Sequence, residues 1–145
     1  MEITNYFRRY IKNYANLCYP LYRLLKKDVP FLWTDKEEQS FNALKNALSN
    51  PPILALPDLT QEIILTTDAS DLSVSYNLSM IKEGQERIIS YGGRSLKPAE
   101  QNYSAVEKEL LAVIAGIKHY HEFLQPKQFL VRTDKLLCYA VSELY

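Results

Sequence analysis

The chain has 145 residues, of which 47% are hydrophobic, and its formal net charge is zero. This composition suits one domain, or one domain with a helical appendage, and excludes a disordered chain. Two cysteines are too few for a disulfide framework, and no apolar stretch approaches the roughly 18 residues of a membrane span, so we expect an intracellular protein (cytoplasm or nucleus) without membrane contact.

Basic residues gather near the N-terminus although the whole chain is neutral. Arg8, Arg9, Lys26 and Lys27 belong to this group. Clustered cations of this kind can contact the phosphates of a nucleic acid, so these four are candidate nucleic-acid-binding residues. A solvated helix face explains the same cluster equally well, and the sequence does not choose between the two.

The residue pattern changes near residue 58 and divides the chain in two. Residues 1–58 have apolar side chains at helical spacing, whereas period-2 alternation begins after them. Asn50-Pro51-Pro52 and Pro57-Asp58 are strong turn signals at this junction. The sequence therefore predicts a helical segment over 1–58 and a second unit over 59–145.

The helical segment is expected to contain two or three helices. Residues 3–27 form one or two of them, with Pro20 breaking or capping between the halves. Thr34 or Asp35 suits the N-cap of the next helix, which ends before Pro51.

The second unit opens with three predicted strands. Ile63 to Thr67 is strand-like, Val74 to Met80 alternates between apolar and polar residues, and Arg87 to Tyr91 forms the third strand. Glu83-Gly84-Gln85 is typical of a hairpin turn, and Gly92-Gly93 permits a bend or bulge.

A helix and a fourth strand follow. Ser104 and Glu107 have the spacing of a capping box, so we expect a helix from about Ser104 to Phe123. Phe129 to Thr133 is the fourth strand. A helix between two strands permits a parallel crossover, which would return the fourth strand to the side of the first.

The first and fourth strands each end in an aspartate, Asp68 and Asp134. Parallel pairing would put both carboxylates at the same edge of the sheet. A carboxylate that closes a buried strand is costly unless it is compensated, and a hard divalent cation compensates it. Aspartate also favours turns, so a simple turn-forming role for Asp68 and Asp71 stays open.

The predicted helix offers Glu107 or Glu109 as a third ligand. Periodicity does not choose between them, because they lie on opposite sides of the apolar stripe. Small side chains at Ala112 and Gly116 leave room beside Glu109, which favours it, and a solvated flank remains the alternative for either glutamate. The apolar stripe consists of Val106, Leu110, Val113 and Ile117.

Five motifs stand in order along the chain: Thr67-Asp68-Ala69-Ser70-Asp71, Ser90-Tyr91-Gly92-Gly93-Arg94-Ser95-Leu96, Glu100-Gln101-Asn102-Tyr103-Ser104, Glu107-Lys108-Glu109-Leu110-Leu111-Ala112 and Thr133-Asp134. Together they resemble the RNase H domain of gypsy-type LTR-retrotransposon and retroviral reverse transcriptases. The N-terminal residues resemble the end of the polymerase region and its link to RNase H. This second resemblance rests on Asn5-Tyr6-Phe7-Arg8-Arg9-Tyr10-Ile11, Pro20-Leu21, Leu24-Leu25-Lys26-Lys27 and Phe31-Leu32-Trp33-Thr34.

The resemblance implies an α/β, RNase H-like fold: a mixed sheet flanked by helices, truncated at the C-terminus and preceded by the helical segment. It implies cleavage of the RNA strand of an RNA–DNA hybrid with two Mg²⁺ (or Mn²⁺) ions, and the rest of a reverse transcriptase polyprotein as partner. It assigns Asp68, Glu109 and Asp134 as catalytic, metal-binding residues, and thereby selects Glu109 over Glu107. The family's fourth carboxylate would lie beyond Tyr145, so the two-ion site can be incomplete.

Some positions depart from the family's pattern. Tyr76 stands where a small residue is usual, Gly92-Gly93 stands where Ala-Ser is usual, and Lys135 stands where histidine is usual. A tyrosine in place of a small residue adds much volume. The alternative interpretation is therefore a catalytically inactive RNase H-like scaffold, or a nucleic-acid- or protein-binding module derived from a retroelement.

Overall fold

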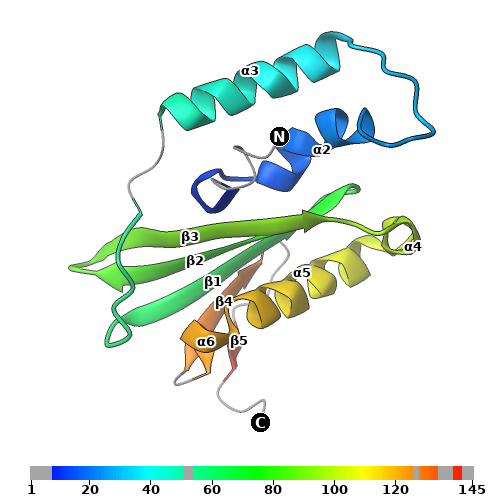
Figure 1. Cartoon of the computed structure of the whole chain (residues 1–145). Helices are drawn as coiled ribbons and strands as arrows, with labels where there is room; N and C mark the ends of the chain where they lie inside the picture. Colours follow the sequence, from blue (N-terminus) through cyan, green and yellow to red (C-terminus); the bar gives the residue numbers. More distant parts are fainter. Residues whose placement is uncertain (1–7, 51–53, 126–127, 134–138, 142–145) are drawn as a thin grey trace.

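The computed structural model describes residues 8–50, 54–125, 128–133 and 139–141, and in them a sheet carries helices on both faces (Figure 1). None of the described helices is long and apolar enough to cross a membrane. The elements in chain order are η1 (Arg8–Tyr10), α2 (Tyr14–Arg23), α3 (Asp35–Ser49), β1 (Glu62–Ala69), β2 (Ser73–Lys82), β3 (Gln85–Ser95), α4 (Pro98–Gln101), α5 (Ala105–His119), α6 (His121–Leu124), β4 (Phe129–Thr133) and β5 (Tyr139–Val141).

The sheet has the strand order β3-β2-β1-β4-β5. β1 and β4 are parallel, whereas the other neighbouring strands are antiparallel. The predicted order of three strands, a helix and a strand is confirmed, as is the crossover that returns β4 to the side of β1. The sequence patterns did not predict β5.

Two apolar clusters lie on opposite faces of the sheet. α5 covers one face, while η1 and α2 lie on the other and α3 packs on α2 (Figure 1). The larger cluster fills the space between the sheet and α5 and includes Leu65 and Ala112. The smaller cluster joins α2 to α3 and consists of Ile11, Cys18, Leu21 and Leu44. The division of the chain at residue 58 stays a prediction.

α2 and α3 confirm one helix signal of the N-terminal segment and contradict another. α3 begins after Thr34, as predicted, and the Thr34 backbone N–H donates to the Glu37 carboxylate at 2.9 Å, which is the reciprocal bond of a capping box. Pro20, however, lies inside α2, so the prediction that it separates two helices is wrong. An interior proline costs about 3 kcal/mol. Burial of Cys18 and Leu21, which are 0% and 6% exposed, offsets that cost and keeps the helix continuous.

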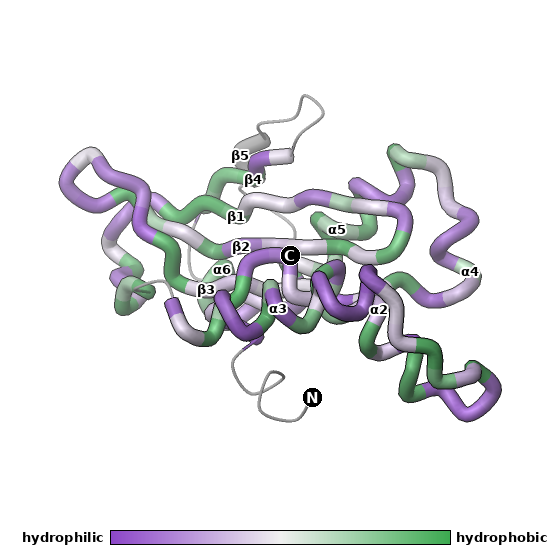
Figure 2. Tube along the Cα trace, turned by 90° about the horizontal axis from the view of Figure 1, so that it is seen from above, coloured by the Kyte–Doolittle hydropathy of each residue, from purple (hydrophilic) through white to green (hydrophobic). Residues whose placement is uncertain are grey.

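The β2–β3 hairpin closes at Glu83 and Gly84, whose φ angles of 54° and 72° confirm the predicted turn. Gly92 and Gly93 pair regularly with Tyr76 and Ser75, so the bulge that they permit does not form there; the register shift lies beside Leu78 and Ser79 instead. Figure 2 shows the hairpin turn as a hydrophilic end of the sheet, with more hydrophobic strand segments behind it.

Gly92 and Gly93 in β3 are required because neighbouring atoms leave no space for a Cβ atom at either position. Gly92 pairs with Tyr76 of β2, and a Cβ at Gly92 would lie 2.6 Å from Tyr76 Cδ2 and 3.0 Å from Tyr120 Oη. A Cβ at Gly93 would lie 2.8 Å from the Val74 carbonyl oxygen. Tyr76 in β2 and the missing side chain of Gly92 in β3 therefore compensate each other across the strand pair, whereas Gly93 lies close to the backbone of β2.

The predicted long helix is interrupted once. α5 starts after the Ser104 cap, where the Ser104 N–H donates to Glu107 at 2.7 Å and Ser104 Oγ accepts from the Glu107 N–H at 3.3 Å. It ends at His119, and α6 follows. Tyr120 lies at the break, 3% exposed, with its hydroxyl donating to the Ser90 carbonyl at 3.2 Å. Anchoring this hydroxyl to β3 turns the chain out of the helix.

Candidate functional site

The parallel ladder between β1 and β4 defines the edge at which the predicted site lies. Its last paired residues are Thr67 and Thr133. Asp68 follows Thr67 within β1, and Asp134 follows Thr133 in the sequence. Asp134 lies outside the described residues, so its predicted position beside Asp68 stays a prediction, although the strand pairing on which it depends is confirmed.

Asp68 is a strand residue and not a turn residue. It is half-buried and pairs with Ser75 of β2. Alternation along β1 puts Thr67, 1% exposed, on the face that Leu65 shares with α5, and turns Asp68 to the face of Thr66. Asp68 therefore reaches the α5 side only around the end of the strand. The alternative turn-forming role fits Asp71, which lies in the β1–β2 turn.

The face of α5 that packs on the sheet differs from the predicted apolar stripe. Lys108, Ala112 and Gly116 are its buried residues, whereas Val106 and Leu110 are 74% and 58% exposed. The small residues explain this orientation, because a Cβ at Gly116 would already lie 3.1 Å from the Leu65 side chain. Close approach of helix and sheet thus outweighs burial of the larger side chains.

The observed orientation separates the two candidate glutamates. Glu107 is exposed and serves the N-cap of α5. Glu109 is half-buried on the flank of the stripe that faces the sheet, and its Oε2 atom is enclosed. Of the two glutamates, Glu109 is therefore the one whose carboxylate lies toward the protein interior.

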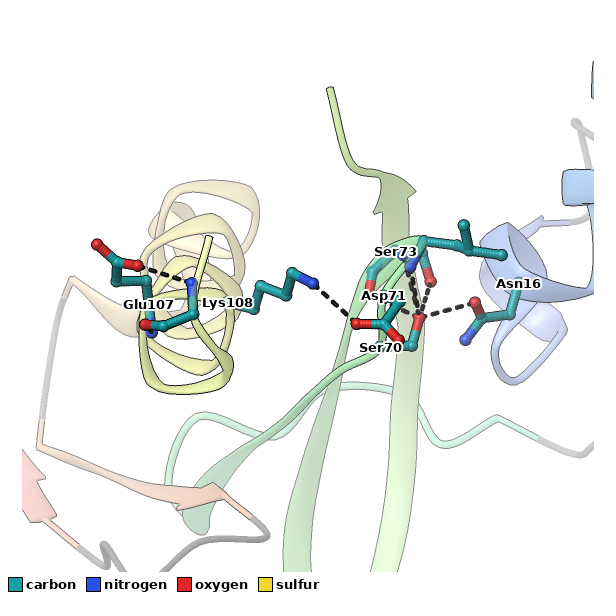
Figure 3. A network of polar contacts seen from close by, with 8 residues as sticks. Asn16, Ser70, Asp71, Ser73, Glu107 and Lys108 are labelled. Atoms are coloured by element: carbon teal, nitrogen blue, oxygen red, sulfur yellow. Dashed lines mark hydrogen bonds and ion pairs between the residues drawn. The ribbon is translucent and has the colours of Figure 1, made fainter. Parts of the chain in front are cut away.

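Lys108 is a charged residue of this region that the sequence patterns missed. Its ammonium lies 2.8 Å from Asp71 Oδ1, with side-chain exposures of 10% and 93% (Figure 3). The hydrogen bond and the charge of Lys108 lower the pKa of Asp71. The bond joins the first turn of α5 to the β1–β2 turn, so Glu109 and Asp68 belong to the same end of the molecule. The spacing of Lys108 with the small Ala112 and Gly116 was the available signal.

The opposite face of the same turn is fixed by α2. Ser70 Oγ donates to Asn16 Oδ1 at 2.9 Å and accepts from the backbone N–H of Ser73 at 3.1 Å (Figure 3). Helices on both faces of the sheet therefore hold the residues that follow Asp68. This rigidity suits a site that must keep its ligands in position.

Among the described residues, no group of three histidine, cysteine, aspartate or glutamate side chains is arranged to hold a metal ion. Two of the three predicted ligands, Asp68 and Glu109, lie in that part of the chain. The three-carboxylate site that also includes Asp134 stays a prediction.

The four candidate nucleic-acid-binding cations lie in two places. Arg8 and Arg9 line a cavity of about 730 Å³ beside β3. Lys26 and Lys27 are exposed in the connection between α2 and α3, which projects beyond the sheet (Figure 2), and do not line this cavity. The structure therefore gives the two arginines a defined setting that the sequence did not predict.

Comparisons with known proteins place these observations in a family. Residues 33–131 match the family described as "RNase H-like domain found in reverse transcriptase". The chain is 39% identical to the Retrovirus-related Pol polyprotein from transposon 412 of Drosophila melanogaster, over 92% of this chain and 11% of that protein. It is 36% identical to the transposon Tf2-3 polyprotein of Schizosaccharomyces pombe, over 90% of this chain and 10% of that protein. It thus spans about a tenth of the length of these relatives.

Solved structures show the same fold at low sequence identity. A foamy viral protease-reverse transcriptase designated dRH, in complex with double-stranded DNA, matches with a TM-score of 0.76 and 17% identity, over 94% of this chain and 24% of that one. The foamy viral enzyme in complex with an RNA/DNA hybrid matches with a TM-score of 0.74 and 17% identity, over 94% and 19%. With the family match over most of its length, the chain belongs to the RNase H-like domains found in reverse transcriptases.

Proposed function

We propose that this chain is the RNase H part of a retroelement reverse transcriptase and cleaves the RNA strand of an RNA–DNA hybrid. The observation that carries the proposal is the parallel pairing of β1 with β4, whose last pair is Thr67 and Thr133. Each threonine is followed by an aspartate, Asp68 and Asp134. Strand ends that meet at one edge are where converging carboxylates are expected.

The residues at this edge fit divalent cations. Asp68 and Glu109 are half-buried carboxylates at the same end of the sheet, and oxygen ligands of this kind suit Mg²⁺ or Mn²⁺. We propose that Asp68, Glu109 and Asp134 hold the metal. When bound, the ions supply an activated water and stabilise the leaving oxygen of the phosphodiester.

The protein side of the mechanism is positioning. Lys108 holds Asp71 at 2.8 Å and fixes the β1–β2 turn against α5. Ser70 holds the same turn to Asn16 of α2 at 2.9 Å. These bonds reduce the motion of the backbone that carries Asp68, so that its carboxylate keeps one orientation toward the substrate phosphate.

Substrate binding is proposed from the fold neighbours and from charge. Solved structures with this fold include reverse transcriptases in complex with an RNA/DNA hybrid and with double-stranded DNA. The exposed cations Arg8, Arg9, Lys26 and Lys27 are proposed phosphate contacts. The rest of the polyprotein is the proposed protein partner, since the curated relatives are polyproteins. An intracellular location belongs to the same proposal.

The test is cleavage of a labelled RNA–DNA hybrid in the presence of Mg²⁺. We expect cutting by the intact chain and a loss of at least a hundredfold in Asp68→Asn, because the substitution removes a charged ligand. Asp58→Asn, a half-buried aspartate in the turn ahead of β1 whose side-chain oxygen accepts a hydrogen bond from Thr60, is the matched control and should cut normally. Equal cutting by Asp68→Asn and the control would contradict the proposal.

The second candidate function is an inactive RNase H-like module that binds another protein. One observation favours it: Val106, Leu110 and Ile114 form an exposed apolar stripe on α5, at 74%, 58% and 42% exposure. This alternative predicts no cutting and no increase of Tm on addition of Mg²⁺, measured on the same samples by thermal denaturation.

A further inference from the structure

A cavity of about 730 Å³ lies beside the edge strand β3, away from the carboxylates. Its walls come from η1, residues 54–57, β3 and the ends of α5 and α6. His119 lines it at the C-terminal end of α5, whereas Glu109 lies near the N-terminal end. At a rise of 1.5 Å per residue, the two are about 15 Å apart along the helix axis. The cavity is therefore a separate place on the molecule.

The charged residues that line this cavity, among those that the structure describes, are cationic. Arg8 and Arg9 line it, and no aspartate or glutamate among the described residues does. The ion pairs of the described residues join Arg94 to Glu100, Lys108 to Asp71 and Arg132 to Glu86, and neither Arg8 nor Arg9 takes part. Two arginines without acidic partners at a cavity wall are a recognition element for an anion, above all a phosphate.

The charge of Arg8 affects His119, a second residue that lines the cavity. Partial desolvation and then the positive charge of Arg8 lower the pKa of His119, which lines the same cavity. His119 is therefore biased toward its neutral form, which leaves a planar ring that can accept a hydrogen bond or stack. The cation and the ring face the same space.

The remaining walls are aromatic and apolar. Tyr91 on β3 and Tyr10 in η1 are half-buried, and Ile89 and Leu56 add apolar surface, with Leu56 88% exposed at the rim. Partly exposed rings beside arginines are the combination that binds nucleotides, because bases stack on the rings while phosphates pair with the guanidinium groups. The volume lies within the range of roughly 300–1,000 Å³ typical of small-ligand sites.

We propose that this cavity binds a nucleotide unit: a base stacked on Tyr91, with its phosphate held by Arg8 and Arg9. The unit can be a free nucleotide or a nucleotide at the end of a single strand. Arg8 and Arg9 are also proposed phosphate contacts of the hybrid, but the existence of this nucleotide site does not require the chain to be catalytic.

The experiment is a titration of the full ¹⁵N-labelled chain, followed by two-dimensional NMR in EDTA without any hybrid. The probes are adenosine 5′-monophosphate, a five-residue oligothymidylate and inorganic phosphate. We expect saturable shifts of the Tyr91, Gly92 and His119 amide signals with one or both nucleotide probes, and smaller shifts with phosphate. Binding of the monophosphate alone identifies a free nucleotide as the ligand, and binding of the oligonucleotide alone identifies a strand end.

Two variants make the result specific. The charge reversal Arg8→Glu with Arg9→Glu should weaken nucleotide binding at least tenfold, and Tyr91→Ala should weaken it about fivefold or more. Lys36→Glu with Lys45→Glu on α3 makes the same charge change away from the cavity and should leave binding unaltered. The dispersion of each variant's spectrum shows whether it is folded.

Three outcomes overturn the proposal. They are the absence of shifts at the cavity residues, equal shifts with inorganic phosphate and with the nucleotides, and equal weakening by the α3 control. None of these bears on cleavage by Asp68, because metal and hybrid are absent from the titration. Failure here and failure of the proposed nuclease activity are therefore distinguishable.

Discussion

Tyr76 and Gly92 are neighbours across the β2–β3 strand pair, and the absence of a side chain at Gly92 leaves space for the Tyr76 ring. Tyr76 is 5% exposed and contacts Tyr120 edge to face, with ring centroids 5.9 Å apart. Its ring occupies the space that a side chain at Gly92 would fill. The departure from the family pattern at Tyr76 is thus structurally accommodated, and by itself it gives no reason to expect a disrupted fold.

This pairing predicts non-additive stability changes. Gly92→Ala should destabilise the chain by about 1–3 kcal/mol through overpacking, and Tyr76→Ala by about 3–5 kcal/mol through the cavity it leaves. The double variant should be more stable than the sum predicts, with a coupling of about 0.5–3 kcal/mol, because the new methyl group enters the vacated space. Urea unfolding measures all three.

Gly84→Ala is the control for this set of single and double variants. Nothing lies within 4 Å of a Cβ at Gly84, so its effect is confined to the strain of its φ of 72°. Combined with Tyr76→Ala it should give an additive result. Additivity of the Gly92 pair as well would show that the two residues do not share space.

At the scale of single elements, α4 depends on an ion pair with β3. Arg94 donates to both carboxylate oxygens of Glu100, at 2.7 and 3.0 Å. The hydrogen bond from Arg94 and a further one from the Lys97 backbone lower the pKa of Glu100 from 4.5 to about 2. Because the folded-state pKa is depressed, the charged form stabilises the fold above pH 4.5, and this contribution is lost as the pH falls toward 2.

We therefore expect a pH-dependent difference between the wild type and Glu100→Gln. The variant should have a lower Tm near pH 6, and the difference should shrink steadily as the pH falls from 4.5 toward 2, because the wild type then loses the same contribution. Thermal denaturation across this range measures it. Glu122→Gln, an exposed glutamate of α6, should show no such trend, and a constant difference for Glu100→Gln would rule out the ion pair as the cause.

Most elements could be predicted from local signals, and the errors share a physical cause. Caps at Thr34 and Ser104 and the bounds of β4 depend on nearby residues, so the sequence predicts them well. The continuous helix through Pro20 depends on burial against distant residues. In the same way, the buried face of α5 depends on how closely Gly116 can approach Leu65. Tertiary contacts of this kind leave no periodic trace in the sequence.

The candidate site was predictable to the same extent. Asp68 and Glu109 could be selected because strand ends and small helix neighbours are visible in the sequence, and the resemblance to a family then fixed the choice of Glu109. Lys108 was missed, because a lysine on an amphipathic helix is usually exposed. The cavity at Arg8 and Arg9 was also missed, since it is formed by four segments that only folding brings together.

At the scale of the whole molecule, the two apolar clusters are separated by the sheet. The cluster around Leu44 joins α2 and α3, and the cluster around Leu65 lies beneath α5. α3 is attached mainly through α2, because the main contacts between the N-terminal helices and the sheet are made by η1 and α2. We therefore expect the N-terminal layer to be a separate unit of local stability.

We expect Leu44→Ala and Leu65→Ala to have different effects. Each removes a buried leucine and should cost about 2–5 kcal/mol. Unfolding can be followed by the fluorescence of Trp33, the chain's single tryptophan beside α3, and by circular dichroism. Leu44→Ala should lower the unfolding midpoint seen by fluorescence more than the midpoint seen by circular dichroism. Leu65→Ala should lower both together. Coincident midpoints in both variants would show that the two layers unfold as one.

The parallel ladder also dictates a sequence of events while the chain is being made. β1, β2 and β3 pair with near neighbours and can assemble as soon as they leave the ribosome, whereas β1 must wait for β4, some sixty residues later. Until then, the edge of β1 is open and the acids at its end have no counterpart across it. While it is being made, the chain can thus carry a formed meander and helix before the proposed carboxylate site is complete.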